Sequence, residues 1–455
     1  MEVLSPPSTG REPGRPAKPC RIPTKRAAVA DAHAPSTWLP LGFILTGVVS
    51  LLAACVWLVW QPELLSTYHY NQYVIAATHL VVLGWICSVL MGAMYQLVPV
   101  ALETRLFSER LARWHLALHA VGFTGMVAMF QVWNLKQVGH FGSILAVGAG
   151  LFVWNLGRTL ARLPRWNLVA AGIASALFWL SLTMLAGLFL ASAKCWPQIN
   201  PFAPIAAMHA HAHLGGAGFF LMMMVAVSYK LVPLFALSEV QSPRRAAASL
   251  VLLNAGVAGV FVTVLTASPW KPAFALVVAA GLLLHGLEIH AILRARKRRA
   301  LDWGLKYFVT AIGLLGPVTA LGLLLSWPDL PATTLTTQLE NVYGLLAFLG
   351  VVTLAILGML YKIVPFLVWY VSYSKAVGLR RAPSLGDLYS PGLQAAGYWL
   401  FLLGLSATGV ATAAAHSTGV RLGAAVLLAG LLMFGLNLGR MLSHLVSPER
   451  GGTAT

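Results

Sequence analysis

Two stretches decide how this sequence folds: His79–Pro99 reads HLVVLGWICSVLMGAMYQLVP, and His213–Pro233 reads HLGGAGFFLMMMVAVSYKLVP. In both, the proline follows the histidine by twenty residues, and the last five residues are Tyr-x-Leu-Val-Pro. A third stretch ends YKIVP at Pro365 and carries Leu345 where the other two carry histidine. Long apolar stretches that recur in this way predict repeated membrane-spanning helices.

A second landmark recurs further along the chain. Asn-Leu-Gly-Arg at 155–158 returns at 437–440, and the weaker Glu-Ile-His-Ala lies between them at 288–291. The period is about 133 residues, and the loop around 371–390 lengthens the last copy. The two landmarks together predict three units of four helices. This period disfavours a transporter built from two halves of six helices.

Composition agrees with a membrane protein. Of the 455 residues, 58% are hydrophobic and 10% are charged, whereas a soluble domain has about 25% charged residues. We therefore predict an all-α polytopic membrane protein of about twelve transmembrane helices in three pseudo-symmetric four-helix repeats. The expected spans lie near 38–60, 72–100, 112–133, 140–162, 166–193, 205–236, 245–266, 271–293, 303–326, 338–368, 392–414 and 420–444.

The basic residues predict the orientation. If both termini are cytoplasmic, 27 of the 31 Lys and Arg residues lie on the cytoplasmic side, as the positive-inside rule requires. The net charge of +18 is then a topology signal, and no nucleic-acid partner is expected. We expect a bacterial-type inner membrane, with a disordered basic cytoplasmic tail at 1–37, a membrane domain at 38–445 and a short cytoplasmic tail at 446–455. The repeats are expected near 38–162, 166–293 and 303–444.

Histidines are the candidate site residues. His79 and His213 share a register, and His209, His211 and His213 form an H-x-H-x-H run. Polar side chains inside a membrane usually face a cavity or cofactor, so His79, His211 and His213 are predicted ligands of heme or metal. For His209 the ligand and packing interpretations stay open.

Other residues near this run allow two interpretations. His119, His285 and His290 are expected to be core residues bonded to backbone carbonyls. Gly84, Gly215, Gly216 and Gly218 leave room for a flat macrocycle, or they mark close helix contacts. Four cysteines without a close pair indicate neither a disulfide framework nor a zinc site.

With these motifs the sequence resembles subunit I of heme-copper oxidases, above all C-family oxidases and the nitric oxide reductase catalytic subunit. That family has twelve helices in three arcs and an H-x-H followed by glycines and Tyr-x-Leu-Val-Pro. The resemblance implies that His79 and His213 are the axial ligands of a b-type heme near the outer face. It also implies that His211 is a candidate ligand of a second heme or of a metal ion with an open coordination position.

The sequence departs from the family in two places. The helix that carries H-x-H in the family has Tyr343 and Leu345 here, and 245–266 lacks the histidines that ligate copper in oxidases. Copper remains a candidate second cofactor, with His209 joined by His140 or His69 from the outer loops. Carboxylates are few in the spans, and one of them, Glu340, lies at the outer start of its helix.

Three functions are compatible with these residues. The first is a membrane heme-binding protein that handles electrons or a diatomic gas, oxygen or nitric oxide; as an enzyme it would be a cytochrome oxidase-like or nitric oxide reductase-like oxidoreductase. The alternative is a copper or other metal or small-solute transporter, which Met222–Met224 favours because thioethers bind Cu(I). A third is an anchor that passes quinol electrons to a partner. Membrane lipid is an expected partner, and a c-type cytochrome or another respiratory subunit is a candidate partner.

Overall fold

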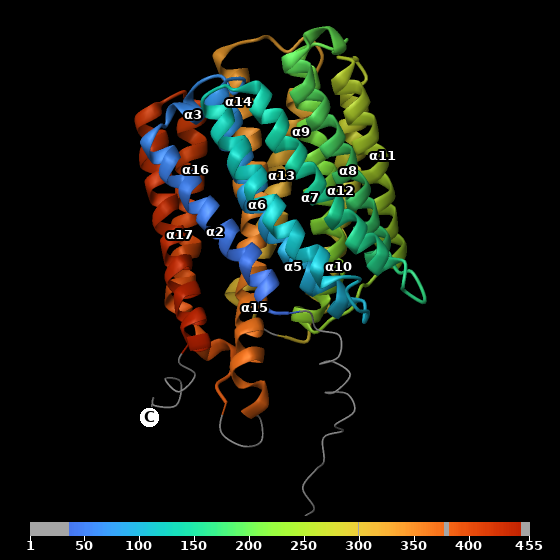
Figure 1. Cartoon of the computed structure of the whole chain (residues 1–455), viewed down its shortest axis with the longest axis vertical. Coiled ribbons are helices and arrows are strands. Elements are labelled where there is room, and N and C mark those ends of the chain that lie inside the picture. Colours follow the sequence, from blue (N-terminus) through green and yellow to red (C-terminus); the bar gives the residue numbers. More distant parts are fainter. Residues whose placement is uncertain (1–35, 299, 377–381, 447–455) are drawn as a thin grey trace, which may run out of the picture.

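The computed structural model describes residues 36–298, 300–376 and 382–446. These residues form helices and short connections and contain no β-strand. The helices run along the long axis of the molecule, with α16 and α17 on one side and α11 and α12 on the other (Figure 1). The expected tails at 1–37 and 446–455 lie almost entirely outside the described residues.

Twelve long helical segments follow one another along the described residues, close to the ranges expected from the sequence. Three of them are composite, with a π-helical segment between two α-helical ones. The segments are α2 (Trp38–Trp60), α4–η1–α5 (Gln72–Ala101), α6 (Glu109–Gln131), α7 (Leu135–Leu160), α8 (Leu168–Cys195), α9–η3–α10 (Pro204–Ala236), α11 (Pro243–Leu265), α12 (Lys271–Arg294), α13 (Trp303–Leu325), α14–η4–α15 (Thr334–Tyr373), α16 (Pro391–Ala413) and α17 (Ser417–Val446). The short helix α3 (Glu63–Ser66) lies between α2 and α4.

Eleven of these described helices are long and apolar enough to cross a membrane. The remaining long helix, α6, has the same length as several of them, but His115, His119 and Gln131 lower its hydropathy. Its neighbours before and after it in the chain both span, so α6 completes the antiparallel order. The chain is an all-α, multi-pass membrane protein.

The third and fourth helices of each unit pack closely in the same way. These pairs are α6 with α7, α11 with α12, and α16 with α17. A Cβ added to Gly122, Gly256 or Gly404 would lie 2.3–2.9 Å from backbone atoms of the paired helix. Each glycine follows the N-cap serine of its helix by fourteen residues. A larger side chain there would push the two helices apart.

The second landmark of the sequence has one structural role in all three units. The side chains of Asn155, Glu288 and Asn437 each accept a hydrogen bond from the backbone N–H of the serine that begins the unit's third helix, at 2.8–3.0 Å. Those serines are Ser108, Ser242 and Ser390, and each hydroxyl in turn caps its own helix. The weak middle landmark is therefore the equivalent of the other two, and this supports the three-unit division.

The three composite helices, which contain the stretches that end at Pro99, Pro233 and Pro365, also share a local irregularity. Each contains a π-helical segment, Leu80–Cys87 (η1), Leu214–Leu221 (η3) or Leu346–Val352 (η4). The residue directly before the segment is His79, His213 or Leu345. A π segment weakens the regular hydrogen-bond ladder and is frequent at functional sites. Its freed carbonyls find other donors here: Leu83 accepts from His119, and Phe348 accepts from Thr353.

Candidate heme and metal site

A large apolar cavity lies between the three composite helices and α8. Its volume is about 1170 Å³, above the roughly 300–1,000 Å³ of pockets that hold drug-sized ligands. Five of its lining residues are histidines, and all three units contribute to its wall: His69, His79, His209, His211, His213, Tyr343 and Leu345. The structure thus brings together the histidines that the sequence singled out, apart from His140.

His79 is held in one orientation by its own helix. Its Nδ1 lies 2.7 Å from the carbonyl oxygen of Ile75, so Nδ1 donates and Nε2 carries the lone pair. Within the described part of the chain Nε2 has no hydrogen-bond partner, and the ring lines the cavity. The ring of Phe130 packs beside it, with centroids 4.9 Å apart. Fixing the far nitrogen in this way is how proteins prepare a histidine to bind a metal.

His213 repeats this arrangement one unit later. Its Nδ1 lies 2.8 Å from the carbonyl oxygen of His209, and its Nε2 has no hydrogen-bond partner among the described residues. Tyr343 of the third unit stacks against the imidazole, with ring centroids 6.1 Å apart. Leu345, which stands at the matching register, is a buried apolar wall of the same cavity. The first and second units therefore each supply an imidazole whose Nε2 can coordinate a metal, and the third unit supplies side chains that pack against them.

His211 points to a different neighbour from His213, as expected for residues two apart on a helix. Its ring lies against α8, where a Cβ added to Gly187 would be 3.1 Å from Cε1. Its Nδ1 is buried and has no hydrogen-bond partner in the described structure. A buried nitrogen without a partner costs about 1–3 kcal/mol, so a ligand to His211 would remove that cost.

The glycines near the histidines divide into two groups. Gly215 and Gly216 line the cavity, as the macrocycle interpretation requires. Gly84 and Gly218 do not; a Cβ on them would lie 2.8 Å from Ser50 and 2.9 Å from Trp179. Those two glycines allow close helix contacts instead. Gly344 on the facing helix lines the cavity, and a Cβ there would meet nothing within 4 Å.

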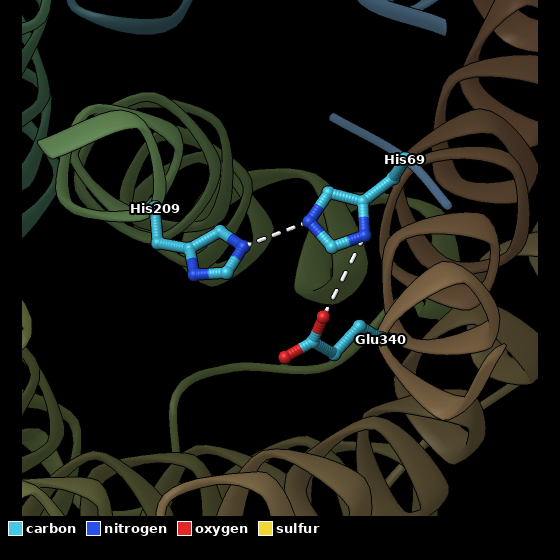
Figure 2. Close-up of side chains that lie close together, drawn as sticks. All are labelled: His69, His209 and Glu340. Atoms are coloured by element: carbon cyan, nitrogen blue, oxygen red, sulfur yellow. Dashed lines mark hydrogen bonds and ion pairs between the residues drawn. The ribbon is translucent and has the colours of Figure 1, made fainter. Parts of the chain in front are cut away.

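His209 meets two residues from the other units, His69 and Glu340, which also line the cavity. Its Nε2 lies 3.0 Å from Nε2 of His69, and Nδ1 of His69 lies 3.6 Å from Oε2 of Glu340. Figure 2 shows the two rings facing each other, with the carboxylate beside His69. One ligand atom from each residue can be chosen so that all three lie within 4.8 Å of one another.

Sequence reasoning missed Glu340 as a member of this group. The available signal was a carboxylate at the start of an otherwise apolar span. His69 was only one of two suggested partners for His209, and the structure selects it. The other, His140, is exposed on α7 and bonds to Gln137 at 3.2 Å, and it does not line the cavity.

The remaining buried histidines belong to the core. His119 bonds to the carbonyl of Leu83 at 3.1 Å, as expected for a core histidine. His285 is also buried, but its partner is the hydroxyl of Tyr229 at 3.1 Å instead of a carbonyl. The prediction for His290 was wrong, because this residue is exposed on α12.

Two further observations bear on function. Met222, Met223 and Met224 are buried in the protein core and do not line the cavity, so they lend no support to a Cu(I) pathway through it. Lys362 forms an ion pair with Asp302, the N-cap residue of α13. Its charge is therefore neutralised by a carboxylate.

Two comparisons with known proteins bear on the first unit. The family described as Cytochrome C and Quinol oxidase polypeptide I matches residues 28–139. Quinol oxidase subunit 1 of Sulfolobus acidocaldarius is 40% identical over 77 residues, which cover 16% of this chain and 15% of that protein. Over these residues the chain is similar to subunit I of heme-copper oxidases. The family match includes His69 and His79, whereas His209, His211 and His213 lie beyond it.

The residues of the cavity fit a heme. The walls are mainly apolar, two imidazoles present free Nε2 atoms, and glycines open space beside them. Two half-buried lysines, Lys194 and Lys271, also line the cavity. They stand at the ends of α8 and α12 and suit the carboxylates of a propionate-bearing macrocycle.

Proposed function

We propose that this protein is a membrane heme-binding protein in which His79 and His213 are the axial ligands of a b-type heme. The observation that carries the proposal is their shared preparation: each Nδ1 is bonded to a backbone carbonyl, and each Nε2 is free and borders the same cavity. A bound b-type heme supplies one-electron redox chemistry or an iron site for a diatomic gas.

The chain's own residues set the conditions for that chemistry. The Ile75 and His209 carbonyls hold both imidazoles in the tautomer that leaves Nε2 able to coordinate. Each such carbonyl also makes the imidazole a stronger donor toward a metal. Apolar walls exclude water, and a low dielectric disfavours the oxidised, more highly charged state of a bound iron. Lys194 and Lys271 would offset the negative charge of the propionate carboxylates of a bound heme.

We further propose that the protein passes electrons or binds oxygen or nitric oxide, working with a c-type cytochrome or another respiratory subunit. The name of the Sulfolobus protein, a quinol oxidase subunit, makes quinol the first electron donor to test. The proposed setting is a bacterial-type inner membrane with both termini in the cytoplasm, and the charge distribution supports it.

The test is a reduced-minus-oxidised absorption spectrum of the purified full chain, joined to a pyridine hemochrome assay. We expect one b-type heme per chain with paired sharp bands of a six-coordinate center. Properly folded protein that contains no heme, after expression with ample heme supply, would contradict the proposal. Copper and zinc analysis of the same sample separates a heme protein from a metal carrier without heme.

A further inference from the structure

We propose that His69, His209 and Glu340 form a binding site for one divalent first-row transition ion, separate from the His79–His213 pair. The three residues come from three units: the loop before α4, the helix α9 and the helix α14. Two imidazoles and a carboxylate suit zinc, copper or iron in the divalent state. The proposal needs no heme in the cavity.

The spacing of the two imidazoles fits a shared ion. The Nε2 atoms of His69 and His209 lie 3.0 Å apart. If each stood about 2.0–2.1 Å from one ion, the two bonds would subtend about 90–100°. That angle lies between octahedral and tetrahedral values. Without an ion, one ring must donate its proton to the other, and an ion replaces that single hydrogen bond with two coordinate bonds.

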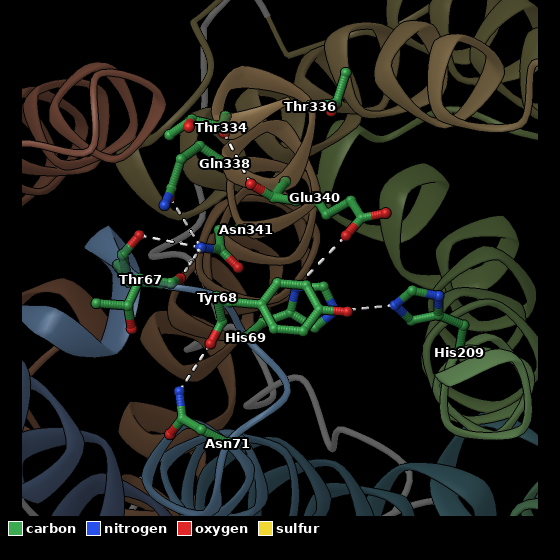
Figure 3. Close-up of polar contacts among 12 residues, drawn as sticks. Thr67, Tyr68, His69, Asn71, His209, Thr334, Thr336, Gln338, Glu340 and Asn341 are labelled. Carbon is green, nitrogen blue, oxygen red and sulfur yellow. Dashed lines mark hydrogen bonds and ion pairs between the residues drawn. The ribbon is translucent and has the colours of Figure 1, made fainter. Parts of the chain in front are cut away.

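The loop that carries His69 is fixed in place, as a metal site requires. Asn341, the neighbour of Glu340, donates from Nδ2 to the carbonyl of Thr67 at 2.7 Å, and its amide is held in turn by Gln338 (Figure 3). On the other side of His69, Asn71 caps α4 and donates to the carbonyl of Tyr68 at 2.8 Å. Residues 67 and 68 are therefore tied to α14 and α4, and His69 follows directly.

Glu340 is placed to complete the ligand set. Its carboxylate lies 3.6 Å from Nδ1 of His69, and its side chain is 35% exposed, so a rotation brings it to the ion. Three protein ligands leave open positions on the ion, as in catalytic sites rather than structural ones.

The alternative is that the three residues only connect the three units and bind no ion. In that case Glu340 balances the charge of Lys271. Lys271 interacts electrostatically with both His209 and Glu340. This neighbour distinguishes the two cases. If the residues form a metal site, removing the positive charge of Lys271 strengthens the binding of a divalent cation. If they only connect the units, its removal creates no affinity for a divalent cation.

The experiment uses the full chain in detergent, stripped with a chelator and titrated with Zn²⁺ against a competing indicator. We expect one tight site per chain, weakened at least 100-fold in His69→Ala and His209→Ala and at least tenfold in Glu340→Gln. His140→Ala is the matched control, because it removes an exposed histidine of α7 that the site does not use, and it should bind as wild type does. With Cu²⁺, paramagnetic resonance should show hyperfine coupling to two nitrogens, and to one in His209→Ala.

A second variant guards against loss of folding. Lys271→Gln keeps all three ligands, and we expect it to bind Zn²⁺ severalfold more tightly than wild type. Equal Zn²⁺ affinity in wild type and His69→Ala/His209→Ala overturns the proposal, and so does unchanged affinity in Lys271→Gln. Heme content measured on the same samples keeps this outcome apart from the heme proposal, since His79→Ala should lose heme and keep the Zn²⁺ site.

Discussion

The imidazoles of His79 and His213 make the same hydrogen bond, from Nδ1 to the carbonyl oxygen four residues earlier, at 2.7 and 2.8 Å. Both residues directly precede a π-helical segment. Residues that occupy the same position in two repeated units, make the same contact and border one cavity are suited to act as a pair.

Removing either imidazole should release the proposed heme. We expect His79→Ala and His213→Ala to lose most of the b-type heme, since one remaining axial ligand holds it weakly. His79→Met should retain heme with a more positive midpoint potential, because thioether ligation favours the reduced iron. The pyridine hemochrome assay and a redox titration measure these effects. His290→Ala, which removes an exposed histidine, serves as the control; full heme retention in both His→Ala variants would exclude the axial assignment.

His211 depends on a glycine of the neighbouring helix. A Cβ at Gly187 would lie 3.1 Å from Cε1 of His211, so Gly187→Ala should displace the ring by a few tenths of an ångström. If His211 ligates a second group, the spectrum or metal content assigned to that group should change. Gly157→Ala is the matched control, because a Cβ there meets nothing within 4 Å. Identical spectra and metal content in both variants would argue that His211 is a packing residue.

The middle unit carries a charged version of a contact that is neutral in the other two. Glu288 is fully buried and accepts hydrogen bonds from Arg245 at 2.8 Å and from the N–H of Ser242 at 3.0 Å. Glu288→Ala leaves Arg245 without its counterion and should cost about 3–5 kcal/mol of unfolding free energy.

The double variant Arg245→Leu/Glu288→Asn installs the residues that the first and third units have at these positions. We expect it to recover most of the stability lost in Glu288→Ala, because asparagine still accepts from Ser242 and no charge is left unpaired. Thermal unfolding in detergent, followed by circular dichroism, compares the variants. A double variant as unstable as Glu288→Ala would show that the units are not equivalent here.

The Asp302–Lys362 pair should give the protein an acid-sensitive contact. Burial tends to raise the pKa of Asp302, but the hydrogen bond and charge of Lys362 outweigh it and hold that pKa below its ordinary value. A carboxyl with a lowered folded pKa stabilises the fold above its unfolded pKa, about 3.9, and this stability is lost as the pH falls through the folded pKa. The difference in melting temperature between wild type and Asp302→Asn should therefore be constant from about pH 5 to 8 and shrink below about pH 4. A difference that grows on acidification would contradict this sign.

Most of the fold could be predicted from the sequence because lipid imposes a simple rule on span length and hydropathy. The expected spans 38–60 and 271–293 match α2 and α12 within one residue. The tenth span, expected near 338–368, is observed at Thr334–Tyr373. Its first turn is polar, with Thr333 and Thr336 forming a capping box, so hydropathy could not reveal it.

The π segments could not be predicted, and of the three-residue cluster the sequence suggested only that His209 could pair with His69 or His140. Leu80–Cys87 has the same apolar composition as a regular helix, and the donor to its Leu83 carbonyl, His119, lies on another helix. The His69–His209 contact joins residues 140 positions apart, and the sequence has no periodicity that relates a loop to a helix. The paired register of His79 and His213 was visible because both lie in repeated helices at one depth.

The contacts between the serine caps and their landmark residues carry information about the order of assembly. They join residues 47, 46 and 47 positions apart, all within a single unit. Each unit can therefore close as soon as its own fourth helix has entered the bilayer, while the ribosome is still making the next one. The His69–His209–Glu340 cluster has no such local route, because it requires all three units to have met. An ion held there would thus mark chains whose insertion is complete, and truncated or misassembled chains would be unable to retain it.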